Sequence, residues 1–242
     1  MRARLSIAPP TVLSSASPPR VQYRLTAADA SARPAAANVM HPLAVNWIGV
    51  DVGGERKGFD VAVIDRCRLL LLRRRLTCVE AVKIVDEVEP AVVGIDSPRC
   101  CAPTGARSRE CERALATQIC GIRWTPDPPA VDSSDYYAWI RHGFKLYDAL
   151  ASVEAEVIEV FPTASWTRWL GKRGSQRRSA WTRSGLSKLA LSSVPSRTNQ
   201  DQRDAIAAAV TARQYYDGTA HRIGEIVVPD AKLLTSAAPP AE

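Results

Sequence analysis

Four aspartates in this sequence occupy places where an ionised side chain is costly unless it has a partner. Asp51 ends one apolar run and is followed by two glycines, and Asp96 ends a second apolar run. Asp201 and Asp204 lie three residues apart at the beginning of a C-terminal segment with helical periodicity. Removing a carboxylate from water is unfavourable without a compensating cation or hydrogen-bond donor. We therefore take Asp51, Asp96 and Asp204 as candidate catalytic residues.

Carboxylates gathered in one place would predict a metal site. Several of them within a few ångströms repel one another, and they stay ionised only when a cation neutralises them. Hard oxygen ligands favour Mg²⁺ or Mn²⁺, and a pair of such ions can activate water and stabilise a departing oxygen at phosphorus. The pattern therefore favours phosphodiester hydrolysis. The predicted metal ligands are Asp51, Asp96, Glu159, Asp201 and Asp204.

Each of these acids also has a purely structural interpretation. Asp51 and Asp96 can serve as turn residues, and Asp201 can cap the helix that follows it. Glu159 interrupts a hydrophobic strand, where a buried glutamate needs a metal, an arginine or an exposed strand face. Asp204 lies inside the helix, one turn after Asp201, and is the better ligand candidate of the two.

A basic stretch that contains tryptophans lies between residues 165 and 183. Cations interleaved with flat aromatic rings suit a phosphate backbone and its stacked bases. The alternative is a solvated basic loop whose tryptophans turn into the core. The predicted nucleic-acid-binding residues are Arg168, Lys172, Arg173, Arg177, Arg178 and Trp181. His142 stands within a helical segment and is expected at the surface or as a cap, not as a catalytic base.

The acids at strand ends need a sheet that brings them together. Hydrophobic runs predict a three-stranded antiparallel meander over residues 46–52, 58–64 and 68–73, followed by a helix over 79–88 that Thr77 caps. Residues 91–96 form a continuous apolar run typical of a parallel strand in a sheet interior. Further helices are expected at 109–118, 136–152 and 201–216, with a short strand at 157–161 and an edge strand at 225–228.

This order of elements predicts an α/β fold of ribonuclease-H-like topology. We expect a mixed five-stranded sheet flanked by helices, in which three antiparallel strands are followed by parallel strands reached through helical crossovers. The first strand is then central and the strand at 91–96 lies beside it, so Asp51 and Asp96 become neighbours at one edge. The last helix can bring Asp201 or Asp204 over that same edge.

Composition divides the chain into three parts. Residues 1–39 contain five arginines against one aspartate, with no Lys, Glu or Gly and no sustained period, so we expect a disordered leader. Met40 stands just before the first strand, and a translation start there or plain disorder is favoured over a targeting segment. Residues 40–229 are expected to form one ribonuclease-H-like domain, and residues 230–242 a disordered tail.

The composition also narrows the class of protein. A hydrophobic fraction of 46% and a charged fraction of 24% are those of a globular protein, and no apolar run approaches the roughly 20 residues of a membrane span. We expect a soluble, cytoplasmic protein with no obligate protein partner. More than half of the net charge of +7 lies in residues 1–39, so charge is weak support for nucleic acid as a partner. The six cysteines lack paired C-x-x-C spacing, which argues against a zinc site.

Five short motifs, taken in order, resemble a known family. They are GVDVGG at 49–54, GIDSP at 94–98, RECE at 109–112, IEVFP at 158–162 and DQRDA at 201–205. The ordered set is similar to domain-of-unknown-function family 429 of bacteria and archaea, described as predicted ribonuclease-H-like nucleases. The resemblance implies the fold and a nuclease assignment. Asp201 and Asp204 are also similar to the i, i+3 acids that end the Holliday-junction resolvase branch of this superfamily.

The chain departs from the family's pattern at two positions, and two other functions compete with a nuclease. Phe161 stands where the family often has a histidine, and Thr163 where an acid often follows the proline. Sugar kinases and other actin-fold ATPases place a similar acid-and-glycine hairpin around ATP phosphates, but they need two such domains and this chain has room for one. The other competitor is a non-catalytic scaffold that binds nucleic acid or a protein through the basic stretch.

Overall fold

The β-strands of the computed structural model assemble into one mixed sheet, and the model describes residues 45–230. The predicted leader at 1–39 and all but the first residue of the predicted tail lie outside the described residues. Five strands carry the predicted core of the sheet. They are β1 (Trp47–Val52), β2 (Phe59–Ile64), β3 (Leu69–Leu76), β4 (Val92–Asp96) and β5 (Glu156–Val160).

The strand order confirms the predicted ribonuclease-H-like α/β topology. The sheet runs β3-β2-β1-β4-β5-β7-β6, with β1, β2 and β3 antiparallel and with β4 and β5 parallel to β1. Within residues 45–230 the sheet has seven strands in place of the predicted five and an edge strand, because β6 (Ala220–Ile223) and β7 (Ile226–Pro229) form a hairpin that pairs with β5. We predicted a single edge strand there. Four-residue strands that reverse at Gly224 (φ 59°) are too short to carry a clear pattern.

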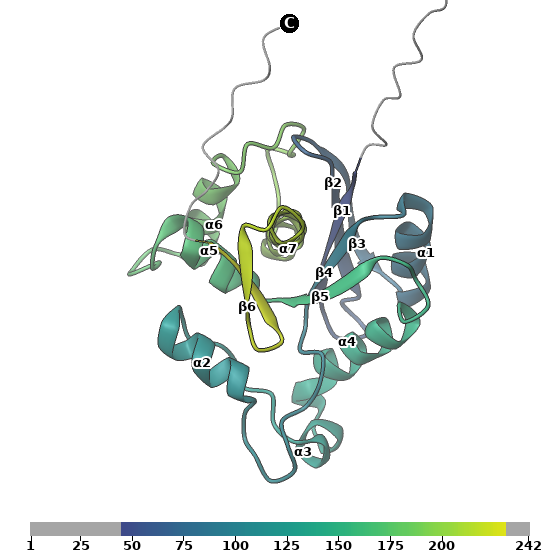
Figure 1. The fold of residues 1–242 in the computed structure, drawn as a ribbon, viewed down its shortest axis with the longest axis vertical. Helices are drawn as coiled ribbons and strands as arrows, with labels where there is room; N and C mark the ends of the chain where they lie inside the picture. Colours follow the sequence, from purple (N-terminus) through teal and green to yellow (C-terminus); the bar gives the residue numbers. More distant parts are fainter. Residues whose placement is uncertain (1–44, 231–242) are drawn as a thin grey trace, which may run out of the picture. The chain divides into compact units, whose positions relative to one another are not determined.

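Helices cover both faces of the sheet. α1 and α4 pack on one face, while α7 packs on the other face with α5 and α6 beyond it (Figure 1). The basic stretch at 165–183, for which a solvated loop was one alternative, overlaps two of these helices, α5 and α6. The helices are α1 (Cys78–Val88), α2 (Glu110–Gln118), α3 (Pro128–Ser133), α4 (Ala138–Ala149), α5 (Pro162–Leu170), α6 (Arg178–Leu186) and α7 (Gln200–Tyr216), with a 3₁₀ turn at Asp135–Tyr137. None of them is long and apolar enough to cross a membrane, as far as residues 45–230 show.

Strand alternation decides which side chains of β1 reach each face. Ile48, Val50 and Val52 join the core against α1 and α4, whereas Trp47 joins the core against α7. Gly49 also faces α7, since a Cβ built there would meet α7 backbone atoms. Because side chains alternate along a strand, Asp51 shares this face with Trp47 and Gly49. The acid of β1 therefore points toward the helix that carries Asp201 and Asp204.

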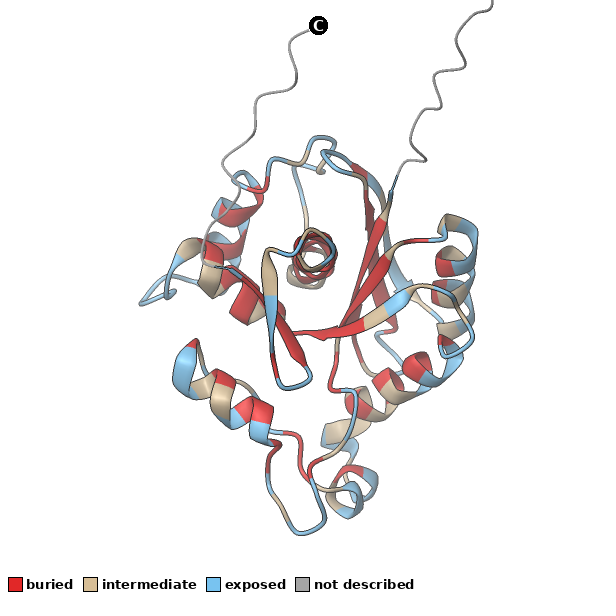
Figure 2. Ribbon diagram, in the orientation of Figure 1, coloured by how far each residue is buried: buried red, intermediate tan, exposed pale blue. Residues whose placement is uncertain are grey.

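α7 lies unusually close to the sheet because small residues meet there. Five alanines of α7 are fully buried, and Figure 2 shows the helix buried on nearly every side. A Cβ at Gly49 would stand 2.1 Å from the carbonyl oxygen of Ala205, and one at Gly94 would stand 2.7 Å from that of Ala208. Asn199 caps the N-terminus of the helix by accepting the N–H of Gln202. These contacts fix the position of the first turn of α7 relative to β1 and β4.

Candidate functional site

Three acids stand side by side across the centre of the sheet. Asp51 on β1 is in register with Asp96 on β4 and with Asp60 on β2. Directly paired residues on neighbouring strands point to the same face, so all three acids face α7. Asp204, in the first two turns of α7, approaches this row from above the sheet. The strand register thus places Asp51 beside Asp96, and the packing of α7 on β1 places Asp204 near them.

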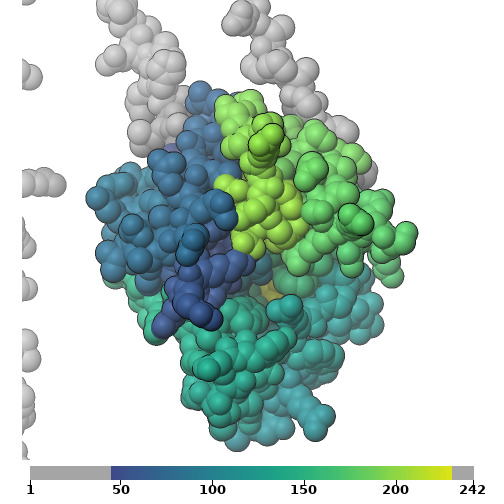
Figure 3. Space-filling model, turned by 180° about the vertical axis from the view of Figure 1, so that it is seen from behind, coloured from purple at the N-terminus to yellow at the C-terminus, as the bar shows by residue number. Residues whose placement is uncertain are grey.

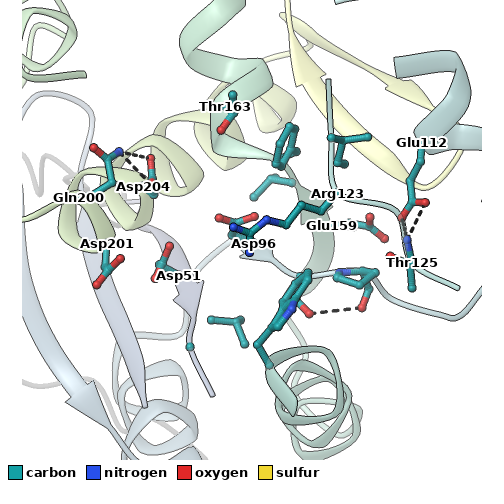
Figure 4. A pocket seen from close by; sticks show the side chains of 18 of the residues that line it. Asp51, Asp96, Glu112, Arg123, Thr125, Glu159, Thr163, Gln200, Asp201 and Asp204 are labelled. Carbon is teal, nitrogen blue, oxygen red and sulfur yellow. Dashed lines mark hydrogen bonds between the residues drawn. The ribbon is translucent and has the colours of Figure 1, made fainter. Parts of the chain in front are cut away.

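Asp51, Asp96 and Asp204 line one open pocket of about 690 Å³. Its walls include Asp51, Asp96, Asp201 and Asp204, together with the glycines after β1. In Figure 3 the blue turn between β1 and β2, the teal region of α2 to α4 and the yellow-green beginning of α7 surround a hollow. Figure 4 shows the four aspartates on one side of the pocket. The volume lies within the roughly 300–1,000 Å³ typical of ligand sites.

Burial and mutual repulsion raise the proton affinity of the central acids. Desolvation, followed by the charges of Asp204 and Asp201, raises the pKa of Asp51 to about 8. Burial, followed by the charges of Asp51 and Asp204, holds the pKa of Asp96 well above its usual range. The pKa of Asp204 is also raised, chiefly by burial. Carboxyls with this environment bind either protons or cations tightly.

Two basic side chains neutralise part of this charge. Lys57, in the turn after β1, places its Nζ 2.7 Å from Asp201 Oδ1 and 4.0 Å from Asp51 Oδ2. Burial lowers the pKa of Lys57, but its hydrogen bond to Asp201 and the neighbouring acids outweigh this and raise it overall. Arg178, at the beginning of α6, donates to Asp204 Oδ2 at 2.9 Å. Both cations line the pocket and are more than 45% exposed.

The carboxylate of Asp204 is held by neutral donors as well. The indole N–H of Trp166 donates to Asp204 Oδ1 at 3.0 Å, and the amide of Gln200 donates to both oxygens at 3.0 Å. Trp166 is fully buried, so its hydrogen bond fixes one oxygen of Asp204 from the protein interior. Asp96, in contrast, forms no side-chain hydrogen bond within residues 45–230. Its carboxylate is therefore free to take a ligand.

The donor set fits a hard divalent cation, although the side chains do not already form a metal cage. Asp51, Asp96 and Asp204 supply carboxylate oxygens whose pKa values are raised first by burial and, for Asp51 and Asp96, also by neighbouring acids, a condition that a cation relieves. In the described part of the chain, no three His, Cys, Asp or Glu side chains converge closely enough to hold an ion as they stand. Cation binding would therefore require Arg178 and Lys57 to release their carboxylate partners.

Comparison with known proteins places the chain in a family. The family model described as protein of unknown function (DUF429) matches residues 49–228. The chain belongs to the DUF429 family. No curated protein matches it.

Two solved structures of RuvC from Thermus thermophilus resemble this DUF429 chain over 72% of its length. One, described as T. thermophilus RuvC in complex with Holliday junction substrate, is 15% identical, with a TM-score of 0.41 and 96% of its own chain covered. The other, described as Thermus thermophilus RuvC structure, is 14% identical, with a TM-score of 0.42 and 98% covered. Similarity at this level says nothing about what this DUF429 chain binds or cleaves.

Glu159, one of the predicted metal ligands, lines the same pocket but has an arginine partner. Its neighbours on β5, Ile158 and Val160, face α7, so alternation turns Glu159 to the opposite face. There both of its oxygens accept from the guanidinium of Arg109, at 2.8 and 2.5 Å, and one also accepts from the backbone N–H of Arg99. The buried glutamate thus has an arginine partner, one of the alternatives that its position in the strand allowed.

Part of the predicted nucleic-acid interface is also wrong. Trp181 is 4% exposed and packs into the core beneath α6, so its ring cannot stack on a base. Arg168 is half-buried and donates to the backbone oxygen of Pro229 at 3.0 Å. The remaining predicted residues, Lys172, Arg173, Arg177 and Arg178, are exposed at the α5–α6 connection and the beginning of α6. Their role in binding nucleic acid stays a prediction.

Three residues important to the site escaped the sequence analysis. Asp60 is 3% exposed, and its signal was an acid inside a strand of otherwise apolar residues. Arg109 lies in a motif quoted for its family resemblance, but nothing local indicates that it meets β5 across fifty residues. His142, expected at the surface, is 7% exposed, stacks on Phe59 and hydrogen-bonds the backbone oxygen of Gly53 at 2.7 Å. It therefore holds the glycine turn beside Asp51.

Proposed function

We propose that this protein is a Mg²⁺- or Mn²⁺-dependent nuclease that hydrolyses phosphodiester bonds. The observation that carries the proposal is the placement of Asp51, Asp96 and Asp204 around one open pocket, with pKa values raised by burial and by one another. Such an arrangement costs folding free energy. It is explained when the site exists to bind a cation and a negatively charged substrate.

The chain's own residues have distinct tasks in this proposal. Asp51, Asp96 and Asp204 would hold the metal, and Trp166 and Gln200 would keep the Asp204 carboxylate oriented. When bound, the divalent ion supplies positive charge that stabilises the negative charge on the phosphate oxygens during in-line displacement by water.

The two basic side chains of the site would serve the substrate. Lys57 and Arg178 are exposed at the pocket, where Lys57 pairs with Asp201 and Arg178 pairs with Asp204. Once released, their cationic ends can bind the phosphate oxygens of the substrate, since charge-assisted hydrogen bonds to phosphate are among the stronger polar contacts. The same two side chains would then exchange a protein carboxylate for a substrate phosphate.

Two alternative functions receive less support from the site. A scaffold of the same fold that binds nucleic acid without cleaving it would not need acids that repel one another beneath a pocket. An ATPase of the actin or sugar-kinase type encloses its nucleotide between two such domains, whereas residues 45–230 form one sheet with its covering helices. Hydrolysis of ATP by the purified chain would revive that alternative.

A panel of labelled substrates tests the nuclease proposal. Single-stranded, duplex and branched DNA and RNA are incubated with the full chain and Mn²⁺, and the products are resolved on denaturing gels. We expect cleavage of at least one substrate by wild type. We expect Asp96→Asn to lower the rate by at least roughly 100-fold, because even outer hydrogen-bond partners of metal ligands cost about 10–100-fold.

A matched variant guards this assay against contaminating nucleases. Asp86→Asn removes an exposed acid of α1 that does not line the pocket, and it should cleave like wild type. Equal cleavage by wild type and Asp96→Asn would contradict the proposal. So would the absence of cleavage of every substrate by a wild-type preparation whose melting transition shows that it is folded.

A further inference from the structure

The pocket continues beyond the acids into a half of different chemistry. This half, which we call the aromatic side, is lined by Pro98, Ile122, Arg123, Trp139 and Phe161. These residues come from the turn after β4, the connection after α2, the first turn of α4 and the junction between β5 and α5. The pocket therefore joins the four aspartates, suited to a cation and phosphate, to a side where apolar groups and Arg123 lie beside the paired Arg109, Glu112 and Glu159.

Trp139 is the main aromatic surface of this half. Phe161 and Ile122 pack in part against a core cluster, whereas Trp139 belongs to none of the three clusters found among residues 45–230. The indole is partly exposed, and its N–H has no hydrogen-bond partner within the described chain. The ring is thus held by packing alone. It can adjust to a ligand without breaking a hydrogen bond.

Arg123 brings a positive charge into the same half. Its side chain is exposed and lines the pocket, and Figure 4 shows it extending from the side of Thr125 into the cavity. It takes part in none of the ion pairs found within residues 45–230. A guanidinium without a carboxylate partner at the mouth of a pocket suits a phosphate.

The connection that carries Arg123 is anchored rather than loose. Glu112 accepts the backbone N–H of Thr125 at 2.9 and 3.1 Å, and it also accepts from Arg109 Nε at 3.0 Å. Arg109 in turn pairs with Glu159 on β5. This buried chain of hydrogen bonds ties the segment before Thr125 to the sheet, so Arg123 begins from a fixed point two residues away.

We propose that the aromatic side of the pocket is a subsite for one unpaired nucleotide, whose base packs on Trp139 and whose phosphate binds Arg123. The proposal rests on the proposed nuclease function and names its substrate class as single-stranded or splayed nucleic acid. A base inside a duplex is covered on both faces by its neighbours and cannot offer a face to an indole that lines a pocket. The adjacent phosphodiester would then lie over the acids.

Binding without cleavage tests the subsite. A fluorescein-labelled tetrathymidylate and a tetrauridylate are titrated with the full chain, in EDTA and again in Ca²⁺, and the anisotropy gives Kd. We expect Trp139→Leu to weaken binding about tenfold or more, the loss expected for one base–aromatic stack, and Trp139→Phe to restore most of the affinity. Arg123→Ala should reduce the slope of log Kd against log salt by about 0.7, the value for one phosphate of a single strand.

Matched controls come from the same region. Trp124→Leu removes a tryptophan that is 48% exposed and does not line the pocket, and Arg107→Ala removes an exposed arginine outside it. Both should bind like wild type. A blunt-ended duplex of two complementary strands, with no loop and no overhang, should compete poorly with the tetranucleotides, because its bases are paired and stacked.

Several outcomes would overturn the subsite. One is that wild type binds neither tetranucleotide in EDTA or in Ca²⁺. Others are an unchanged Kd in Trp139→Leu, or an equal loss of affinity in Trp139→Leu and Trp124→Leu. The nuclease proposal fails separately, in the cleavage assay with Asp96→Asn. Cleavage that does not depend on Trp139 would support the nuclease proposal and contradict the subsite. Binding that depends on Trp139, without any cleavage, would support the subsite and contradict the nuclease proposal.

Discussion

Asp51 and Glu159 are both buried acids, and their partners give them different chemistry. Glu159 accepts two hydrogen bonds from Arg109, so its negative charge is compensated within the protein. The cation that neighbours Asp51 within residues 45–230 is Lys57, at 4.0 Å, and the negative charges of Asp204 and Asp201 act on Asp51 as well. The charge of Glu159 is thus satisfied within the fold, whereas Asp51, beside other acids, is available to a proton or a metal.

The raised pKa of Asp51 predicts a dependence of stability on pH. Its pKa is about 8 in the folded chain against 3.8 as the reference, so the folded state binds the proton more tightly than the unfolded state. The free energy of unfolding should therefore fall as pH rises from about 4 to about 8, by an amount on the order of a few kcal/mol. Asp51→Asn removes this loss and should be more stable than wild type at pH 8 in EDTA.

Urea denaturation across this pH range measures the effect. The difference in unfolding free energy between Asp51→Asn and wild type should be small near pH 4 and grow toward pH 8. Asp86→Asn, at an exposed position, should show no such growth. Parallel pH profiles for wild type and Asp51→Asn would show that the ionisation of Asp51 does not cause the loss of stability with rising pH.

The contact between α7 and the sheet is the element-level feature that builds the site. Gly49 and Gly94 let the backbone of α7 lie almost against β1 and β4, and the buried alanines of the helix continue this fit. Asp204 immediately precedes Ala205, whose carbonyl oxygen lies over Gly49. The same contact therefore sets the distance of Asp204 from the acids of the strands. The packing of the core and the geometry of the candidate site are thus coupled through one helix.

Gly49→Ala should disturb both the packing of α7 on the sheet and the position of Asp204. The new methyl would stand 2.1 Å from backbone atoms of Ala205 and Ala209, which cannot move aside as a flexible side chain would. We expect destabilisation of about 1–3 kcal/mol or more, the usual cost of overpacking a core. We also expect weaker metal binding, because α7 must shift away from β1.

Gly54→Ala provides the control for this substitution. A Cβ at Gly54 meets nothing within 4 Å, and its backbone needs no left-handed conformation. Denaturant unfolding should give wild-type stability for Gly54→Ala and a lower midpoint for Gly49→Ala. Wild-type stability in both variants would mean that α7 is not held as closely as its contacts with Gly49 indicate.

At the scale of the whole molecule, folding brings together acids from distant parts of the chain. Asp51, Asp96 and Asp204 come from β1, β4 and α7, and the unfolded chain keeps them apart. Their repulsion is therefore a cost of the folded state alone. A cation that binds only this assembled site should stabilise the fold, because a ligand of the native state shifts the unfolding equilibrium.

Thermal melting in Mg²⁺ and Mn²⁺ tests this linkage. The melting temperature of wild type should rise with metal concentration, and the stabilisation reaches about 2.7 kcal/mol when the free metal is 100 times Kd. Asp51→Asn should abolish the rise, while Asp86→Asn should keep it. A melting temperature that metal leaves unchanged in both wild type and Asp51→Asn would favour the non-catalytic scaffold.

Local sequence was enough to find strands β1 to β5, the helices α1, α2, α4 and α7, and the acids at their ends. Apolar runs mark β1 and β4, the pair Thr77 and Glu80 forms the capping box of α1, and the alanine-rich period marks α7. These signals are local because hydrophobic alternation and capping depend on residues a few positions apart. The order of elements then gave the sheet topology and the neighbouring places of Asp51 and Asp96.

Tertiary structure alone decided which of these residues have partners and which remain free. The pairing of Arg109 with Glu159, the burial of His142 and Trp181, and the place of Trp139 and Arg123 on one pocket wall join segments far apart in the chain. No local pattern encodes them. They depend on which face each strand residue takes and on how closely α7 and the segment after α2 pack, and these are properties of the assembled sheet.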